Sequence, residues 1–313
     1  MHLKIGTRRS PLAMAQTNHV MALIGARHPH VTFSLQTIAT VADKDRVSEF
    51  HEFRMIGVFS TEHEEQLVSG EADIVVHSLK DLPTTLREGL VLAAVPERED
   101  PRDVLCGKPL EALKAGGRIG TGSLRRRAQI LALCPQAEIV PIRGNVGPRL
   151  AKIEGEAGLD AVILAKAGLE RLKIGRPESE TLDPKTFPYA VGQGALGIEA
   201  RAADAEILAV LKDIEVPKVR AEVDAERAML HALGAGCSLP VGVDAFWDGE
   251  TLHLHGQVTS IDGKQVVTAS RSGLGSQAEA IGIATAEALK AEGGAEILAA
   301  SYGNFAHFKF HGA

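Results

Sequence analysis

The chain has 313 residues, of which 45% are hydrophobic and 24% charged, with a formal net charge of −6 at pH 7. This composition is typical of a globular protein of two or three domains, and the net charge argues against a basic surface for nucleic acid. No apolar stretch approaches the roughly 18 residues of a membrane span, and no signal-peptide core is seen, so we expect a cytoplasmic protein without a membrane partner.

The N-terminal part alternates between short apolar runs and helical patterns, as in βαβ units. A strand is predicted at 3–6. Ser10 followed by Pro11 predicts a helix start, because serine is a favoured N-cap and proline fits the first helical position. A second buried strand, predicted at 73–77, ends in the polar run 78–83.

A polar stretch at 97–103 predicts a crossing to a second α/β unit. The elements expected there are strands at 118–120, 138–142 and 160–164 and helices at 123–133 and after Gly144. The glycine-rich segment 190–199 predicts a return to the first unit.

The last third changes character. The elements predicted there are a helix at 218–233, hairpin turns at 248–249 and 262–263, a strand at 251–255 and a helix at about 276–292. The fold class is therefore α/β, with two α/β units and a smaller C-terminal α+β domain that contains an antiparallel sheet. The predicted domains are 1–96 with 195–214, 97–194, and 215–313.

Three cysteines without metal-type spacing fit a reducing compartment. Cys237 follows Gly234 and Gly236 directly after a helical pattern, and glycines let a bulky group approach the sulfur. Two interpretations remain open: a thiol that carries a group, or a helix C-cap followed by a half-buried cysteine. Cys106 and Cys134 lack this setting and are predicted to be packing residues.

Arginines gather in three loops that are expected to join a strand to a helix, at 7–10, 120–127 and 143–149. In such loops backbone N–H groups, the helix dipole and guanidinium groups converge, which suits carboxylate or phosphate. A single arginine is more often a solvated surface residue. Three loops at equivalent places indicate a ligand with several negative groups.

Asp81 follows Lys80 in the loop after the strand at 73–77. A carboxylate among cations stays ionised and could stabilise a developing cation or exchange a proton with a leaving amine. The alternative is an Asx turn ahead of Pro83.

His253 and His255 alternate along a predicted strand. Because no third ligand accompanies them, we interpret them as an exposed sheet face rather than a metal site.

Six motifs give the chain a specific resemblance. They are residues 7–13, 77–83, 122–126, 143–147, 190–195, and 226–228 leading to 236–237. In order and interval they resemble the porphobilinogen deaminase family over nearly the whole chain. The resemblance implies a transferase of tetrapyrrole biosynthesis, hydroxymethylbilane synthase, which joins four porphobilinogen molecules head to tail, releases ammonia at each step and frees hydroxymethylbilane by hydrolysis. It also implies a covalent dipyrromethane cofactor, a monomer, and two α/β domains like those of periplasmic binding proteins around a cleft.

The resemblance gives roles to individual residues. Cys237 matches the cysteine that carries dipyrromethane through a thioether, and Asp81 matches the catalytic carboxylate, with Arg8 and Arg143 beside it. Matches to cofactor contacts are Asp43, Ser78, Lys80, Thr121, Ser123, Arg125, Arg126 and Arg149. Matches to substrate contacts are Arg8, Ser10, Phe59, Arg143, Arg149, Arg171 and Gln193. Arg127 matches no role, and no metal is implied.

The segment before Phe59 departs from the family pattern. Members usually have a glycine- and lysine-bearing loop there, often Gly-Lys-Gly, whereas Arg54 is the only basic residue of 52–59. Residues 60–63 also differ from the usual Thr-Lys-Glu, and Gly122 replaces a common serine. If the loop is a lid, its contacts with substrate carboxylates must differ.

Two other function classes fit part of the sequence. Two α/β domains with a hinge crossing also suit a periplasmic-type solute receptor. Such a receptor is exported and therefore needs a signal peptide, and it has no use for a thiol in a glycine loop. The run 123–127 suits a nucleic-acid binder, which is expected to be basic with interleaved aromatics; this chain has a net charge of −6 and 4% aromatic residues.

Overall fold

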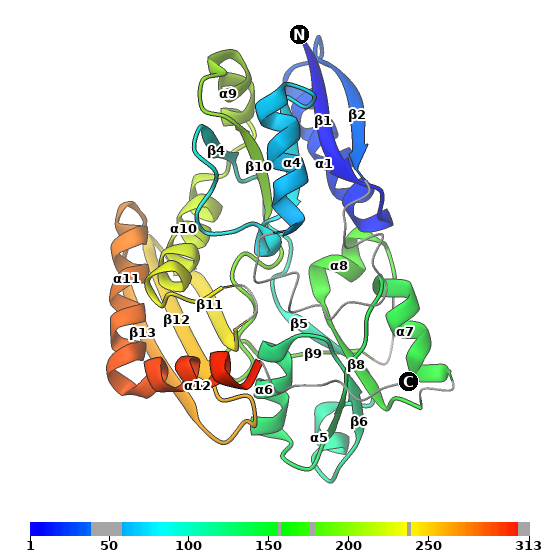
Figure 1. The fold of residues 1–313 in the computed structure, drawn as a ribbon, viewed down its shortest axis with the longest axis vertical. Helices are drawn as coiled ribbons and strands as arrows, with labels where there is room; N and C mark the ends of the chain where they lie inside the picture. Colours follow the sequence, from blue (N-terminus) through cyan, green and yellow to red (C-terminus); the bar gives the residue numbers. More distant parts are fainter. Residues whose placement is uncertain (39–57, 156–157, 176–178, 237–238, 306–313) are drawn as a thin grey trace.

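The computed structural model describes residues 1–38, 58–155, 158–175, 179–236 and 239–305. Within these ranges the strands form two five-stranded mixed sheets and one three-stranded antiparallel sheet. Figure 1 shows the first sheet at the end of the molecule that carries the N-terminus, the second at the opposite end, and the three-stranded sheet beside the second. No helix in the described part of the chain is long and apolar enough to cross a membrane.

The first sheet has the strand order β2-β1-β3-β10-β4. Its strands are β1 (His2–Arg8), β2 (Thr32–Ile38), β3 (Ile74–Ser78), β4 (Leu90–Ala94) and β10 (Leu196–Arg201), and its helices are α1 (Pro11–Arg27), α4 (Val58–Ser69) and α9 (Ala205–Lys212). β1 runs parallel to β2 and β3, whereas β10 runs antiparallel to β3 and β4. The strands predicted at 3–6 and 73–77 are confirmed. The return of the chain after residue 190 is also confirmed, because β10 completes this sheet.

Local sequence explains where α1 begins. The Ser10 hydroxyl accepts a hydrogen bond from the Ala13 amide at 3.2 Å, and Pro11 occupies the first helical position, where no amide donor is needed. Val20 and Ile24 of α1 then pack with Leu3 and Ile5 of β1 in one core, and all four residues are 0% exposed.

The second sheet has the order β7-β6-β8-β5-β9. Its strands are β5 (Asp103–Gly107), β6 (Arg118–Gly120), β7 (Glu138–Val140), β8 (Ala161–Ala165) and β9 (Ser179–Thr181), and its helices are α5 (Leu110–Leu113), α6 (Leu124–Leu133), α7 (Val146–Glu154) and α8 (Lys166–Arg171). β6, β7 and β8 are parallel, and β5 is antiparallel to β8. β5 was not among the predicted strands, because the polar stretch 97–103 that leads into it was interpreted as the connection between the two α/β units. Cys106 and Cys134 are buried on this sheet and its helices, as predicted.

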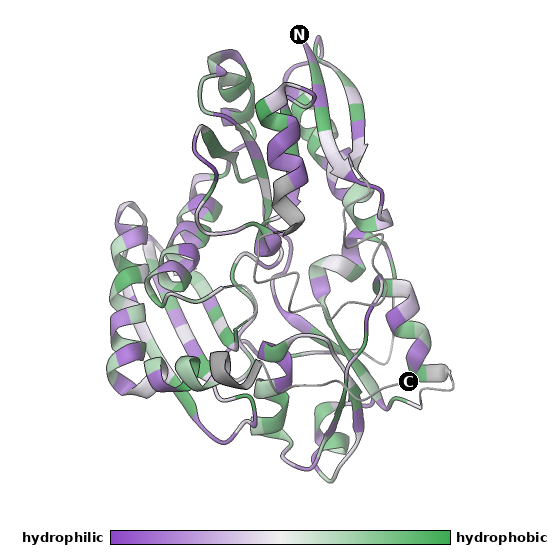
Figure 2. Ribbon diagram, viewed as in Figure 1, coloured by the Kyte–Doolittle hydropathy of each residue, from purple (hydrophilic) through white to green (hydrophobic). Residues whose placement is uncertain are grey.

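The three-stranded sheet consists of β11 (Val241–Asp248), β12 (Thr251–Thr259) and β13 (Val266–Leu274). It packs against α10 (Pro217–Ala232), α11 (Ala278–Leu289) and α12 (Ala295–Phe305), with Met229, Leu254 and Ala286 fully buried between them. Both predicted hairpins are confirmed. In Figure 2 the strands carry bands of hydrophobic colour between pale or hydrophilic ones, whereas α4 is largely hydrophilic.

The two histidines of β12 point away from this core. His253 stacks on Phe246 with ring centroids 4.9 Å apart, and His255 shares a 3.0 Å hydrogen bond with the Ser270 hydroxyl. Their contacts are those of a sheet face.

Two glycines let segment 190–195 pass between the first two sheets. Gly192 has φ +71°, and a Cβ there would lie 3.0 Å from the Lys80 amide nitrogen. Gly194 has φ +83°, and a Cβ there would collide with the carbonyl oxygen of Glu99. Only glycine allows this close passage without strain.

Candidate active site

The predicted site residues of the first sheet lie at one edge. β1 and β3 are parallel, so their carboxyl ends meet there, and the antiparallel β10 places its amino end beside them. Arg8 ends β1, Ser78 ends β3, and Asp81 ends the short 3₁₀ helix Leu79–Asp81 that follows. Gln193 shortly precedes β10. The topology therefore brings these residues to one side of the sheet.

The second sheet repeats this arrangement. The carboxyl ends of β6, β7 and β8 lead into Thr121, Arg143 and α8, which ends at Arg171. Asp103 begins β5 and pairs with Ala165, the last residue of β8, so its carboxylate also lies at this edge. The arginine-bearing loops therefore gather at the carboxyl edge of the sheet, the usual location of ligand sites in open α/β sheets.

Gln193 connects the two edges. Its side-chain oxygen accepts from Lys80 Nζ of the first unit and from Arg126 Nη2 of the second, both at 3.4 Å. Its side-chain nitrogen donates to Asp103 Oδ1 at 2.8 Å and to the Pro101 carbonyl at 2.7 Å. Gln193 is 1% exposed, so it acts in this structure as a buried bridge between the two units.

Arg125 and Arg126 share one buried carboxylate. Asp103 accepts from Arg125 Nη2 at 2.7 Å and from Arg126 Nη2 at 2.6 Å and Nε at 3.1 Å. Asp103 is fully buried, and the arginines are 4% and 6% exposed. Burial would raise the pKa of Asp103, but attraction to both guanidinium groups outweighs burial and holds the pKa well below its usual range. The carboxylate therefore stays ionised.

This cluster of Asp103, Arg125 and Arg126 retains positive charge. Two guanidinium charges and one carboxylate charge leave a net charge of +1 away from solvent. Burial lowers the pKa of Arg125 more strongly than Asp103 raises it. Arg125 also directs one terminal nitrogen to the Pro188 carbonyl at 2.7 Å, yet its Nε is buried without an acceptor among the described residues. A buried cation with an unused donor favours an anionic ligand.

Three hydroxyl groups at the site act as acceptors for the backbone. Ser123 caps α6 and accepts from the Arg126 amide, and Thr121 accepts from the Ser123 amide at 3.1 Å. Ser10 caps α1. Because a hydroxyl can donate while it accepts, each O–H can still donate to a carboxylate. Ser78 differs, since it exchanges hydrogen bonds with the Gln16 side chain at 2.8 and 3.1 Å.

The remaining predicted residues differ in exposure. Asp81 and Arg143 are exposed, whereas Lys80 and Arg149 are half-buried. Arg171 donates to the Gly194 carbonyl at 2.6 Å, and burial lowers its pKa. Asp43 and Cys237 lie outside the described residues, as does the side chain of Phe59.

Sequence reasoning missed a second buried ion-pair cluster. Arg98 donates to Glu226 of α10 at 2.7 and 3.2 Å and to Glu222 at 3.1 Å. The Gly192 amide donates to the same Glu226 carboxylate at 2.7 Å, and Arg98 Nε donates to the Gln193 carbonyl at 3.0 Å. Burial opposes the charge of Arg98, but attraction to Glu226, Tyr189 and Glu222 together outweighs burial and raises the pKa of Arg98. The cluster therefore ties Arg98 and segment 190–195 to α10 of the C-terminal unit.

Two family models match the chain. They are described as "Porphobilinogen deaminase, dipyromethane cofactor binding domain", at residues 3–209, and "Porphobilinogen deaminase, C-terminal domain", at residues 220–291. The chain belongs to the porphobilinogen deaminase family. A porphobilinogen deaminase of Nostoc sp. (strain PCC 7120) is 44% identical over 303 residues, 95% of this chain and 93% of the relative. One of Desulforudis audaxviator is 45% identical over 299 residues, 94% and 96% of the two chains.

The resemblance found in the sequence is thus confirmed. Membership of the porphobilinogen deaminase family makes this protein an enzyme of tetrapyrrole biosynthesis with a domain for the dipyrromethane cofactor. Similar solved structures include a probable amino-acid ABC transporter extracellular-binding protein of Bacillus subtilis, with TM-score 0.40 and 13% identity over 68% of this chain and 90% of that chain. The BenM effector binding domain with benzoate has TM-score 0.40 and 14% identity over the same shares.

Proposed function

We propose that this protein is a hydroxymethylbilane synthase, a transferase that condenses four porphobilinogen molecules head to tail on a covalently bound dipyrromethane primer. Ammonia leaves at each step, and hydrolysis releases hydroxymethylbilane. The observation that carries the proposal is the connection through Gln193 of two sheet edges, one with Asp81 and the other with the arginine-bearing loops. A pyrrole chain with acetate and propionate groups needs both, since its carboxylates require cations and its reacting carbon becomes cationic.

The residues present suit the dipyrromethane cofactor. Its carboxylates would compensate the net positive charge of Asp103, Arg125 and Arg126 and could occupy the unused donor of Arg125. When bound, this cofactor supplies the pyrrole to which substrate rings are joined. We assign its thioether to Cys237, because a thiolate is a strong nucleophile toward an electrophilic methylene. Its proposed contacts are Asp43, Ser78, Lys80, Thr121, Ser123, Arg125, Arg126 and Arg149.

Asp81 is the proposed catalytic carboxylate. Its exposed position at the end of Leu79–Asp81 leaves it accessible to a substrate. An ionised carboxylate stabilises the positive charge that develops on a pyrrole as ammonia departs. Arg8 and Arg143 are proposed to act beside it. The proposed substrate contacts are Arg8, Ser10, Phe59, Arg143, Arg149, Arg171 and Gln193.

Several broader properties belong to the same proposal. The protein is a cytoplasmic monomer that acts on porphobilinogen without nucleic acid or membrane. Its domains are 1–96 with 195–214, 97–194, and 215–313. Strand order supports this division, because β10 joins the first sheet after the second sheet is complete.

Intact-mass measurement of the purified protein and of Cys237→Ala tests the function. We expect a dipyrromethane-sized addition on the unaltered chain and none on the variant, together with porphobilinogen consumption by the unaltered chain alone. An unmodified native chain that consumes no porphobilinogen, even when preformed bilane is supplied, would sink the proposal.

A further inference from the structure

Helix α10 presents one row of side chains to the segment that carries Asp81. Val219 and Val223 lie in one buried cluster with Leu79 and Leu82, which flank Asp81. Residues four apart share a helix face, so Arg227 is the next member of this row. The helix therefore meets the Asp81 segment with two apolar side chains and one guanidinium.

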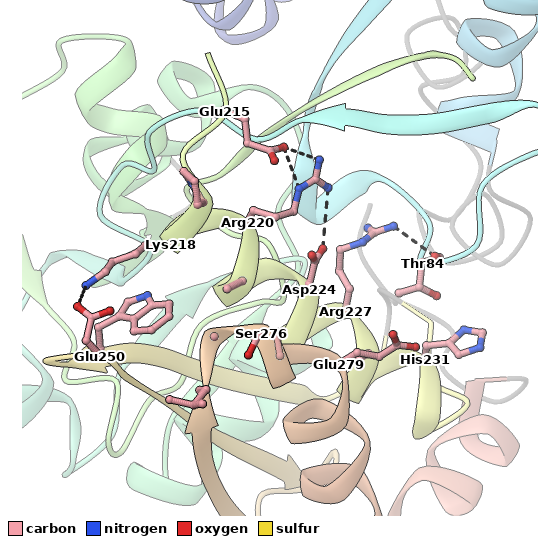
Figure 3. A pocket seen from close by; sticks show the side chains of 17 residues that line it. Thr84, Glu215, Lys218, Arg220, Asp224, Arg227, His231, Glu250, Ser276 and Glu279 are labelled. Carbon is pink, nitrogen blue, oxygen red and sulfur yellow. Dashed lines mark hydrogen bonds and ion pairs between the residues drawn. The ribbon is translucent and has the colours of Figure 1, made fainter. Parts of the chain in front are cut away.

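Arg227 binds the backbone that follows Asp81. Its Nη1 donates to the Leu82 carbonyl at 3.2 Å, and its Nη2 donates to the carbonyls of Pro83 at 2.7 Å and Thr84 at 3.3 Å. Figure 3 shows the guanidinium of Arg227 directed from the helix toward Thr84. A planar guanidinium can serve three consecutive carbonyls at once, whereas a lysine ammonium on a flexible stem cannot hold the same geometry.

The opposite face of α10 is fixed in the C-terminal unit. Ala225, Met229 and Leu230 are buried in the core that α10 shares with the three-stranded sheet. The helix ends at Ala232, and Cys237 follows shortly afterwards in the sequence. One rigid element thus contacts the Asp81 segment on one side and leads toward the proposed cofactor cysteine on the other.

We propose that Arg227 is a positioning residue, which holds the backbone of 82–84 on α10 and so sets the place of Asp81 relative to the unit that carries Cys237. This inference rests on the proposed function of Asp81 and Cys237. Arg227 acts through the backbone, so its loss should affect the reaction more than substrate binding. A displacement of about 1 Å at a reacting group can reduce the rate on the order of a hundredfold.

The matched control is Arg220, which lies on the same helix. Arg220 donates to the Leu92 carbonyl at 2.8 Å and to Glu215, away from the Asp81 segment. Both arginines line one pocket of about 1000 Å³, so methionine fits at either position without overpacking. The experiment measures intact mass, KM, kcat and the hydrogen exchange of peptides that span 79–86 for three variants, Arg227→Lys, Arg227→Met and Arg220→Met.

We expect all three variants to carry the cofactor, with KM within about threefold of the unaltered enzyme. In Arg227→Met, kcat falls at least tenfold and hydrogen exchange accelerates in 79–86. The kcat of Arg227→Lys lies between that of Arg227→Met and that of the parent. The kcat of Arg220→Met stays within about twofold of the parent. Equal kcat values for Arg227→Met and Arg220→Met overturn the positioning role and leave the proposed function intact. A change in Arg227→Met that is confined to KM has the same meaning. If Arg227→Met does not fold, Arg227→Lys decides by the same criteria. An unaltered chain without cofactor and without turnover overturns the proposed function itself.

Discussion

Replacement of Asp103 by asparagine tests the charge balance of the buried cluster. Asparagine keeps the shape of the side chain but removes its charge and replaces one acceptor oxygen with a donor group that faces cations. Asp103 accepts one hydrogen bond from Arg125, two from Arg126 and one from Gln193. Breaking a buried ion pair by removal of one partner costs about 3–5 kcal/mol of unfolding free energy. We expect Asp103→Asn to lose this amount in the Cys237→Ala protein, which on the proposed assignment does not carry the cofactor.

The same substitution should cost less in protein that carries dipyrromethane. Cofactor carboxylates would then compensate part of the charge of Arg125 and Arg126, so the loss should be smaller by about 1 kcal/mol or more. Urea unfolding of the four proteins, with cofactor loading checked first by intact mass, measures both differences. A loss below about 1 kcal/mol in the Cys237→Ala background would refute the buried ion pairs. Equal losses in both backgrounds would refute the assignment of these arginines to the cofactor.

The pH dependence of this loss follows from the pKa of Asp103. The folded state holds that pKa well below its usual range, so the stabilisation is fully present above the unfolded pKa of about 4 and is lost as the pH falls through the folded value. The difference in unfolding free energy between the parent protein and the Asp103→Asn variant should therefore be constant from pH 8 to about pH 5. A difference that shrinks between about pH 8 and 6 would show that the carboxylate is not ionised by its arginine partners.

Three further predictions concern Asp81 and the junction between the units. Asp81→Asn should reduce porphobilinogen turnover by about a hundredfold or more while the unfolding free energy changes by less than about 0.5 kcal/mol, because the side chain is exposed; undiminished turnover removes Asp81 from catalysis. Arg98→Met should lower the unfolding free energy by about 3–5 kcal/mol, because it leaves the fully buried carboxylate of Glu226 unpaired; a loss near zero in urea unfolding would contradict this. Gly194→Ala should lower it by about 2 kcal/mol or more, since φ is +83° and the Cβ meets the Glu99 carbonyl; an unchanged melting temperature would show that segment 190–195 can move aside.

The fold was largely predictable because hydrophobic periodicity reports burial directly. The strands at 3–6, 73–77, 118–120 and 160–164, the helix start at Pro11 and both C-terminal hairpins depend on local signals, and the structure confirms them. β5 was missed because its first residue is a charged Asp103 after a polar segment. Its burial is possible only because Arg125 and Arg126, distant in sequence, neutralise it. No pattern local to 97–107 contains that information.

The candidate site was predictable in position but not in detail. Strand-to-helix junctions with arginine indicate an anion site, and parallel strands bring such junctions to one edge. The sequence does not show how each arginine is oriented. Arg125 and Arg126 read as groups that face a ligand, yet each also holds Asp103, and Gln193 bridges two units besides its proposed role toward substrate. Asp103, Arg98 and Arg227 lie in segments that the sequence analysis singles out, but it gives them no site role because their partners lie far along the chain.

If Arg125 and Arg126 bind the cofactor as proposed, their burial explains how an acidic chain can bind a polyanion. With a net charge of −6, the protein as a whole does not attract carboxylates at long range. On the proposed assignment, part of the attraction comes from cations that are shielded from water and salt, where Coulomb interactions are stronger than at the surface. Asp103 makes this burial possible, because it cancels one of the two guanidinium charges and leaves one for the ligand. Full neutralisation would remove the attraction, and no neutralisation would destabilise the fold, so a single carboxylate between two arginines satisfies both requirements.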